Sequence, residues 1–326
     1  HPVYVVADLS ANHNGDLDTA IRAVKMAKEA GADAIKAQCY SAFSITVNKD
    51  IPIESGEWAG QTYWDLYSKA CTPIEWNVRM AEEAKRVGIG FFSTPFSEGD
   101  ADDLERWVNP DVYKIASFEI VDLPLIEHIA RKGKPVILST GLANFTEIDK
   151  AVEILKRANV LFALLHCISS YPAKEEELDM RRMKMLEAYD CPIGFSDHTR
   201  GIYASIVATT LGANILEKHF TPDNWYSPDA IFSLGVDDFR QMVEAIRTTE
   251  QMLKPRLVDT ANPNYQLRPS IWVVEDMRAG QYFTEANLKT LRPSSGMRPA
   301  NYWDVIGEQA KTDVVAGTPL LEEMII

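Results

Sequence analysis

Strand-like and helix-like segments alternate eight times along residues 1–253, and this alternation constrains the fold more than any other feature. Each short apolar run ends in polar residues and precedes a segment with helical periodicity. The predicted strands are 3–7, 34–39, 90–92, 112–116, 135–138, 161–165, 192–195 and 215–216, and the predicted helices are 17–30, 72–88, 98–107, 123–132, 145–158, 180–189, 203–211 and 236–253. Regular alternation of this kind predicts an all-parallel sheet.

Eight such units over about 250 residues match the size of a (β/α)8 barrel, the TIM barrel. The alternative is an open, doubly wound sheet. Such a sheet usually carries a glycine-rich phosphate turn after its first strand, and residues 7–15, ADLSANHNG, do not form one. The sequence therefore predicts an α/β fold with a TIM barrel in residues 1–253.

The remainder of the chain has a different character. Residues 254–268 contain two prolines and no hydrophobic period, which indicates a linker. Residues 269–326 combine short strands with turns and predict a small β-rich domain. A domain of this size is marginally stable by itself, so we expect it to pack on a partner.

Net charge indicates which macromolecules the chain can bind, and cysteine content indicates its redox environment. The 326 residues carry a net charge of −14, from 47 acidic and 33 basic side chains, which disfavours nucleic acid and anionic membranes as partners. The four cysteines lack CxxC spacing and are typical of reduced thiols. No apolar run approaches a membrane span, and no signal peptide precedes the first strand. We therefore expect a cytoplasmic protein.

Polar side chains follow every predicted strand, at the barrel end where active sites lie. They are Asp8, Asn12, His13, Lys36, Gln38, Ser93, Thr94, Lys114, Ser117, Glu119, Ser139, Thr140, Ser169, Tyr171, Ser196, His198, Glu217, His219 and Asp229. This distribution predicts a single polar site built from all eight strand ends.

The stretch 192–220 is predicted to place two histidines at this end. Its strand–helix–strand pattern brings His198 and His219 to neighbouring strand ends. Two neutral imidazoles so placed suit a divalent transition metal. The alternative is that each histidine only caps its own strand through a backbone hydrogen bond.

Three lysines lie within or near strands. Lys36 and Lys114 are costly to bury unless they meet an anion, which predicts a phosphate or carboxylate site. The alternative is that both side chains extend past the barrel rim. Because side chains alternate along a strand, Lys218 is expected to form an ion pair outside the barrel wall.

A long insertion, residues 40–63, separates the second strand from its helix. Loops of this length in compact domains are usually lids or binding loops, and a plain surface excursion is the alternative.

The order of the motifs resembles the sialic acid synthase family. ANHNG, KAQ, STPFS, YKIASFE, ILSTG, SDHTRGI, EKHFT and SPDAIFSL occur in succession. EWAGQTYWDLYSKACTPIEW and SSYPA are most similar to the pseudaminic acid synthases of that family. The tail, with WVVEDMRAGQYFTEANLKTLRPSSG, resembles the family's antifreeze-like (SAF) domain.

This resemblance implies a metal-dependent transferase that condenses phosphoenolpyruvate with an acylamino-sugar aldehyde. It implies 2,4-diacetamido-2,4,6-trideoxy-L-altrose as the sugar, with pseudaminic acid and phosphate as products. His198 and His219 would bind the divalent metal, typically Mn²⁺. The positions that match phosphoenolpyruvate contacts are Lys36, Thr94, Lys114, Ser117, Ser139, Ser169 and Ser196. The positions that match sugar contacts are Gln38, Glu119, Tyr171 and Asp229, and Gln61 lies in the stretch 57–62 that is specific to the pseudaminic branch.

The resemblance also bears on catalysis and assembly. The candidate catalytic residues are Asp8, Glu217 and Glu119, with Asp8 or Glu217 as the base that activates water. The family usually has Glu where this chain has Asp8. Arg292 matches an arginine that enters the partner subunit's site in a domain-swapped homodimer.

Other functions stay open on the residues alone. N-acetylneuraminate and legionaminate synthases share the family's motifs. A Schiff-base aldolase would use a lysine such as Lys114 as nucleophile. A non-enzymatic carbohydrate-binding protein is suggested only by the tail.

Overall fold

The computed structural model describes residues 1–56, 58–222, 227, 229–255 and 261–326. The chain divides into two compact units, residues 1–254 and 255–326, each described by itself below. The predicted linker 254–268 includes residues 256–260, which lie outside the described residues, as do Glu57 of the branch-specific stretch and Pro228 of SPDAIFSL.

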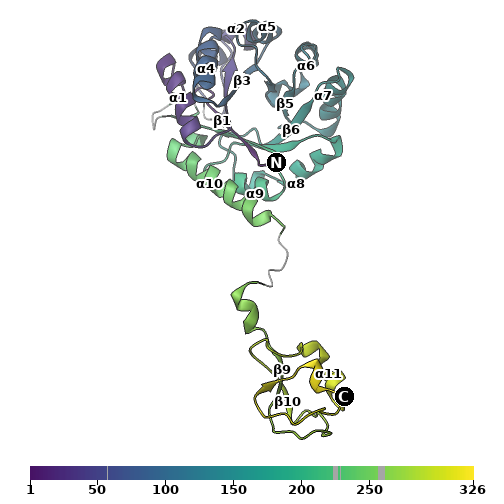
Figure 1. Ribbon diagram of the computed structural model, residues 1–326. Helices are drawn as coiled ribbons and strands as arrows, with labels where there is room; N and C mark the ends of the chain where they lie inside the picture. The colour runs from purple at the N-terminus through teal and green to yellow at the C-terminus, as the bar shows by residue number, and fades with distance from the viewer. Residues whose placement is uncertain (57, 223–226, 228, 256–260) are drawn as a thin grey trace. The chain divides into compact units, whose positions relative to one another are not determined.

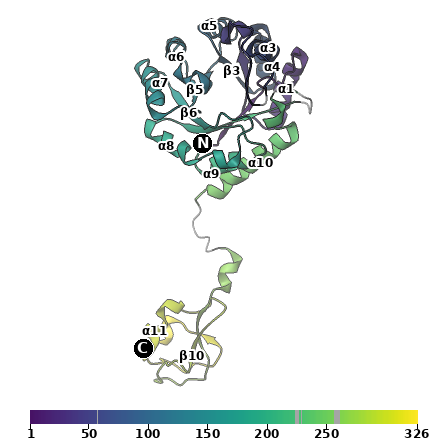
Figure 2. The same ribbon diagram turned by 180° about the vertical axis from the view of Figure 1, so that it is seen from behind.

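The first unit is a closed parallel barrel surrounded by helices (Figures 1 and 2). Strands β1 to β8 follow one another around the barrel, and β1 pairs with β8. The strands are Tyr4–Asp8, Ala34–Cys39, Gly90–Pro95, Tyr113–Ile115, Val136–Ser139, Phe162–Cys167, Ile193–Asp197 and Ile215–His219. The α-helices α1 to α10 are Leu17–Glu29, Ala42–Ile45, Tyr63–Ala70, Ile74–Val87, Glu98–Trp107, Leu123–Ala130, Phe145–Arg157, Arg181–Met185, Tyr203–Thr210 and Val236–Leu253. The predicted TIM barrel is confirmed, and closure through β1 and β8 excludes the open sheet.

Short-range signals in the sequence explain the helices. In α1, the side chain of Asp16 accepts a hydrogen bond from the Thr19 backbone N–H and caps the first turn. The buried positions Ala20, Ala23, Val24 and Ala27 form one face at helical spacing, which packs toward the strands.

Alternation along the strands divides the inside of the barrel into two layers. A lower apolar layer contains Val6, Ala34, Phe92, Ile137, Ala163 and Leu165. Two residues further along β1, β2 and β5, on the same faces, stand Asp8, Lys36 and Ser139. The apolar layer is therefore the floor of a polar site at the carboxyl ends.

Gly194 shows how closely β7 and β8 approach. A Cβ atom at this position would lie 2.2 Å from the carbonyl oxygen of Ile215 and 2.6 Å from Leu165 Cδ2. Glycine is therefore required here for the strands to keep their spacing.

The insertion between β2 and α4 folds over the barrel end as α2 and α3, and an isolated bridge joins Pro52 to Thr62. Several of its side chains line the cavity described below, which favours a binding loop over a plain surface excursion.

The second unit contains a three-stranded antiparallel sheet of order β10-β9-β11, as predicted for a small β-rich domain. Its elements are η5 (Pro263–Leu267), β9 (Ser270–Val273), β10 (Leu288–Leu291), η6 (Pro299–Asn301), α11 (Tyr302–Val305), β11 (Thr318–Pro319) and η7 (Glu322–Met324). The unit has its own core, which includes Ile271, Val273, Phe283 and Leu320.

All four cysteines are free thiols. Within the described ranges, the helices are each too short or too polar to cross a bilayer.

Candidate active site

A cavity of about 550 Å³ opens at the carboxyl ends of the strands. Its described lining combines polar residues from the strand ends with a wall of aromatic and aliphatic side chains. The polar lining consists of Asp8, Ser10, Lys36, Gln38, Ser55, Lys114, Ser117, Glu119, Ser139, Tyr171, Ser196, His198, Glu217, His219 and Asp229. Residues from seven of the eight strands and their following loops therefore contribute polar groups to one site.

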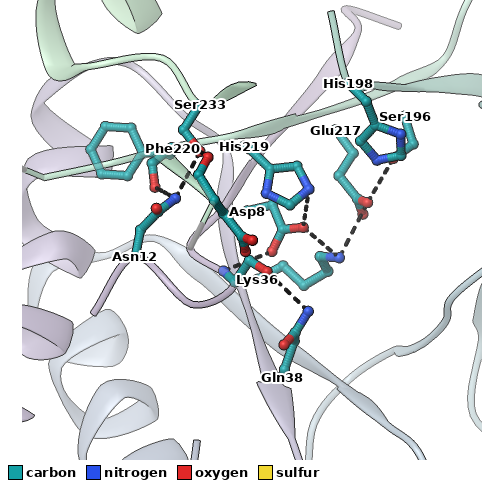
Figure 3. Close-up of polar contacts among 12 residues, drawn as sticks. Asp8, Asn12, Lys36, Gln38, Ser196, His198, Glu217, His219, Phe220 and Ser233 are labelled. Atoms are coloured by element: carbon teal, nitrogen blue, oxygen red, sulfur yellow. Dashed lines mark hydrogen bonds and ion pairs between the residues drawn. The ribbon is translucent and has the colours of Figure 1, made fainter. Parts of the chain in front are cut away.

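Two buried carboxylates and two buried lysines lie together in this cavity. Figure 3 shows Asp8, Lys36 and Glu217 of this group. Lys36 Nζ lies 2.9 Å from Asp8 Oδ2 and 3.2 Å from Glu217 Oε1. Lys114 Nζ lies 3.9 Å from the same Glu217 oxygen. The lysines are not at the barrel rim, since both are almost fully buried. Their burial is compensated inside the protein by carboxylates from β1 and β8.

The pKa values of the two carboxylates, Asp8 and Glu217, are shifted in opposite directions. Burial raises the pKa of Asp8 above its ordinary value, although Lys36 opposes this. Burial would also raise the pKa of Glu217, but Lys114 and Lys36 outweigh it and hold that pKa well below its usual range. Divergent pKa values in one site mark groups with different roles in proton transfer. The lysines therefore favour the ionised form of Glu217, whereas burial disfavours the ionised form of Asp8.

Hydroxyl groups surround Lys114 at the β4, β5 and β6 ends. Lys114 Nζ donates to Ser139 Oγ at 2.7 Å, and the hydroxyls of Ser117 and Ser169 lie 2.8 Å apart. Ser196 Oγ donates to Glu217 Oε1 at 2.9 Å. Ammonium groups and hydroxyls at these spacings can bind the oxygens of a phosphate or carboxylate.

Two of the positions matched to phosphoenolpyruvate lie apart from the cavity lining. Thr94 is buried with its hydroxyl unpaired in the described structure, and Ser169 is hydrogen-bonded to Ser117, which lines the cavity. Their roles remain predictions.

His198 and His219 lie at neighbouring strand ends, with ring centroids 5.4 Å apart (Figure 3). His198 Nδ1 donates to the carbonyl of Ile168 at 2.7 Å, which directs its other nitrogen elsewhere. His219 Nε2 lies 3.4 Å from Asp8 Oδ2, while its buried Nδ1 has no partner in the described structure. Burial lowers the pKa of His198 to about 3 and that of His219 to about 4, so both rings are neutral near pH 7.

This arrangement fits a divalent metal. Neutral imidazoles are donors that transition metals prefer. His219 has a buried Nδ1 without a partner in the described structure, and His198 Nε2 makes a long, 3.5 Å contact with Ser196 Oγ. Among the described residues, no cluster of three or more His, Cys, Asp or Glu side chains is arranged around one metal position. The two histidines would therefore need water or substrate oxygens to complete a coordination shell.

Only some of the residues matched to sugar contacts line the cavity. Gln38, Glu119, Tyr171 and Asp229 line the cavity, whereas Gln61 is not among its described lining residues. Arg292 is exposed at the end of β10 in the second unit.

Glu119 has an unusual environment. Its Oε2 is buried without a hydrogen-bond partner in the described structure. Burial raises the pKa of Glu119 to about 7, so its carboxyl group exchanges a proton near neutral pH. A carboxyl group of this kind is suited to general acid or base catalysis.

The structure adds residues that sequence reasoning missed. Tyr40, Tyr67 and Phe96 belong to the apolar wall, and Phe232 packs on both Tyr171 and His219. Ser10 lines the cavity in a left-handed conformation, with φ of 44°. Tyr40 and Phe96 lie just after strands, and Tyr67 lies in the short helix α3 of the insertion, so no extended periodic pattern indicates where these side chains point.

A closed parallel barrel with buried lysines, carboxylates and histidines at the carboxyl ends of its strands defines the class of TIM-barrel enzymes. The chain belongs to the NeuB family, whose model matches residues 23–256, and the SAF domain model matches residues 268–326. The resemblance stated from the motifs is thereby confirmed.

Two relatives and one solved structure are similar to most of this chain. The chain is 41% identical to the pseudaminic acid synthase of Helicobacter pylori, over 98% of this chain and 96% of that protein. It is 34% identical to the N,N'-diacetyllegionaminic acid synthase of Campylobacter jejuni, over 94% and 95% of the two chains. The crystal structure of the N-acetylneuraminic acid synthetase from Leptospira borgpetersenii, in complex with citrate, has a TM-score of 0.73 and 31% identity, over 82% of this chain and 92% of that one.

Proposed function

We propose that this protein condenses phosphoenolpyruvate with 2,4-diacetamido-2,4,6-trideoxy-L-altrose, giving pseudaminic acid and phosphate. The observation that carries the proposal is the pairing of a lysine and hydroxyl cluster with an adjacent histidine pair in one cavity. The names of the similar pseudaminic acid synthases support the choice of sugar. The experiment that tests it is phosphate release from phosphoenolpyruvate against a panel of sugars, described at the end of the Discussion.

In this proposal the cavity has two parts. Lys36, Lys114 and the serines at the β4, β5 and β7 ends hold the carboxylate and phosphate of phosphoenolpyruvate. Gln38, Tyr171 and Asp229 contact the sugar. The wall that includes Trp58 and Tyr63 offers an apolar contact for the methyl group of a 6-deoxy sugar, where other sugars carry a hydroxyl.

His198 and His219 would hold a divalent metal, supplied as Mn²⁺ in assays. When bound, the metal would supply Lewis-acid polarisation of the aldehyde oxygen. The alkene carbon of phosphoenolpyruvate forms a bond to the aldehyde carbon, and the aldehyde oxygen takes a proton from Glu119. Water then adds to the carbon that bears the phosphate, with Asp8 as the base. The bond between that carbon and the phosphate oxygen breaks, and phosphate leaves with that oxygen and the hydroxyl proton as the added oxygen becomes the ketone oxygen. Glu217 stays ionised throughout and holds the two lysines in place.

Glu119 gives this proposal a pH signature. As the acid it must be protonated, so kcat is expected to fall as the pH rises through about 7, the pKa of Glu119. Glu119→Gln should lower kcat and remove this decrease from the pH profile. The same raised pKa predicts that the stability contributed by Glu119 is present below its unfolded pKa and is lost as the pH rises through 7. An unchanged profile in Glu119→Gln would exclude Glu119 as the acid.

The second unit is proposed to complete the site of a partner subunit in a domain-swapped dimer. Fully extended, the stretch 254–268 would span about 50 Å, at about 3.3 Å per residue, but its reach is shorter because Pro263–Leu267 form η5. The exposed Arg292 can donate to an acylamino carbonyl. Mixing Arg292→Ala with His219→Ala subunits tests this, because exchange creates one site with both lesions and one with neither. Activity should return on mixing; if Arg292 serves its own barrel, every site keeps one lesion and no activity returns.

One observation favours a Schiff-base aldolase as the second candidate. Burial lowers the pKa of the Lys114 ammonium, which makes its amine more available as a nucleophile. Borohydride would then trap a carbonyl substrate on Lys114. Loss of activity with EDTA and no trapped adduct would favour the condensing synthase.

A further inference from the structure

An ion pair outside the barrel wall lies directly behind the two histidines. Lys218 Nζ is 3.1 Å from Asp197 Oδ1, and both side chains are completely buried. This confirms the predicted ion pair of Lys218. Asp197 precedes His198 and Lys218 precedes His219, so each member of the pair is the immediate neighbour of one histidine.

The register of β7 and β8 explains this placement. Ser196 stands opposite Glu217 and Asp197 stands opposite Lys218 in the parallel ladder. Because side chains alternate between faces, Ser196 and Glu217 point into the barrel, whereas Asp197 and Lys218 point outward. The next step along both strands returns to the inside with His198 and His219, which line the cavity.

The pair also fixes the chain that follows His198. Asp197 Oδ1 accepts hydrogen bonds from the Thr199 backbone N–H at 2.9 Å and from Thr199 Oγ1 at 2.7 Å. Lys218 Nζ donates to the Thr199 carbonyl at 2.5 Å. On the helix side, Ser205 Oγ of α9 donates to Asp197 Oδ2 at 2.8 Å. His198 therefore lies between Asp197 and Thr199, and both of these residues contact Lys218 on the strand that carries His219.

A buried ion pair is poor evidence for stability. Replacing such a pair with apolar side chains of similar size is often neutral or stabilising, because the cost of desolvating two charges disappears. Its polar bonds do impose one geometry on the groups that make them. That geometry is the spacing of two strand ends, which carry the histidines.

We infer that Asp197 and Lys218 are positioning residues for the two-histidine site: they set the distance and orientation of His198 and His219 for a divalent cation without touching it. The inference rests on the proposed metal site. Partners behind metal ligands typically change metal affinity by about 10- to 100-fold when removed.

The test uses Asp197→Leu/Lys218→Met, which removes both charges together and leaves neither unpaired. The full chain is titrated with MnCl₂ in a calorimeter, and its unfolding midpoint in denaturant is measured. We expect the Mn²⁺ Kd to rise about tenfold or more. The unfolding midpoint should fall, because the buried donors of Thr199 and Ser205 lose Asp197 as their acceptor. A matched control is Asp33→Leu/Arg247→Met, which removes a partly buried pair with a 2.8 Å contact away from the histidines. The control should leave the Mn²⁺ Kd unchanged.

Two further measurements keep the inference testable. Thr199→Val removes the Thr199 hydroxyl, with its bond to Asp197 and its 3.5 Å contact with Lys218 Nζ. It should weaken Mn²⁺ binding in the same direction even if the double variant does not fold. ¹⁵N NMR of the metal-free chain reports the His198 tautomer that the bond to Ile168 fixes. The double variant should show mixed tautomers where the wild-type chain shows one.

The outcomes separate this inference from the proposed function. If the wild-type chain does not bind Mn²⁺ through His198 and His219, the proposed metal site is wrong. If the wild-type chain binds Mn²⁺ and both variants bind it equally tightly with unchanged histidine spectra, the positioning role is wrong.

Discussion

Replacing His198 or His219 with alanine is expected to remove bound Mn²⁺ and to reduce turnover by at least about a thousandfold, the effect of several kcal/mol of lost Lewis-acid stabilisation. Both imidazoles are neutral because burial lowers the pKa of each ring well below 7. Both rings line the cavity, and the described residues show no group of three or more potential ligands that could hold the metal without them. Metal content by mass spectrometry and phosphate release measure the two effects.

His166→Ala is the matched control for these variants. His166 is also buried near the end of a barrel strand, but its Nε2 contacts the Leu178 carbonyl at 2.7 Å and it does not line the cavity. This variant should lose stability and keep its metal. Stoichiometric Mn²⁺ and full activity in His198→Ala or His219→Ala would contradict the ligand assignment.

Lys36→Met is expected to fail in a different way, with metal retained and phosphoenolpyruvate binding weakened by about 100-fold, which corresponds to about 3 kcal/mol. Lys36 contacts both Asp8 and Glu217, so its removal leaves two buried carboxylates facing an anionic substrate. Breaking a buried pair on one side also costs about 3–5 kcal/mol of stability. Calorimetry with phosphoenolpyruvate and denaturant unfolding measure the two losses.

The control for Lys36→Met is Lys28→Met. Lys28 lies on the outside of the barrel and donates to the Gly88 carbonyl at 2.8 Å. Its replacement should change neither binding nor stability appreciably. Adding Asp8→Asn to Lys36→Met should recover part of the lost stability, since it removes one of the stranded charges. Unweakened phosphoenolpyruvate binding in Lys36→Met would remove this lysine from the anion site.

Much of the fold could be predicted from local periodicity in the sequence. Eight alternations predicted the barrel, and the period of two within β8 correctly separated Glu217 and His219 from Lys218. These inferences succeed because side-chain direction within a strand follows from backbone geometry alone.

Long-range pairing was not predictable in the same way. The counter-charges of Lys36 come from β1 and β8, and their contact depends on barrel closure between segments about 200 residues apart in sequence. The aromatic wall includes Tyr40 from an insertion that has no period and Phe96 from the loop after β3, and the two meet only in the folded barrel. The separation of Gln61 from the cavity has the same origin, since its loop is held by backbone bonds to Ile53.

The central claim is the condensation itself, and phosphate release tests it most directly. The chain is incubated with MnCl₂, phosphoenolpyruvate and a panel of acylated aminohexoses in H₂¹⁸O, with phosphate assayed and products identified by mass. The account predicts sugar-dependent phosphate release that is fastest with 2,4-diacetamido-2,4,6-trideoxy-L-altrose, a product that contains the carbons of both substrates, and ¹⁸O in that product rather than in phosphate. No phosphate release with any sugar, or faster turnover of N-acetylmannosamine than of the trideoxy sugar, would contradict it.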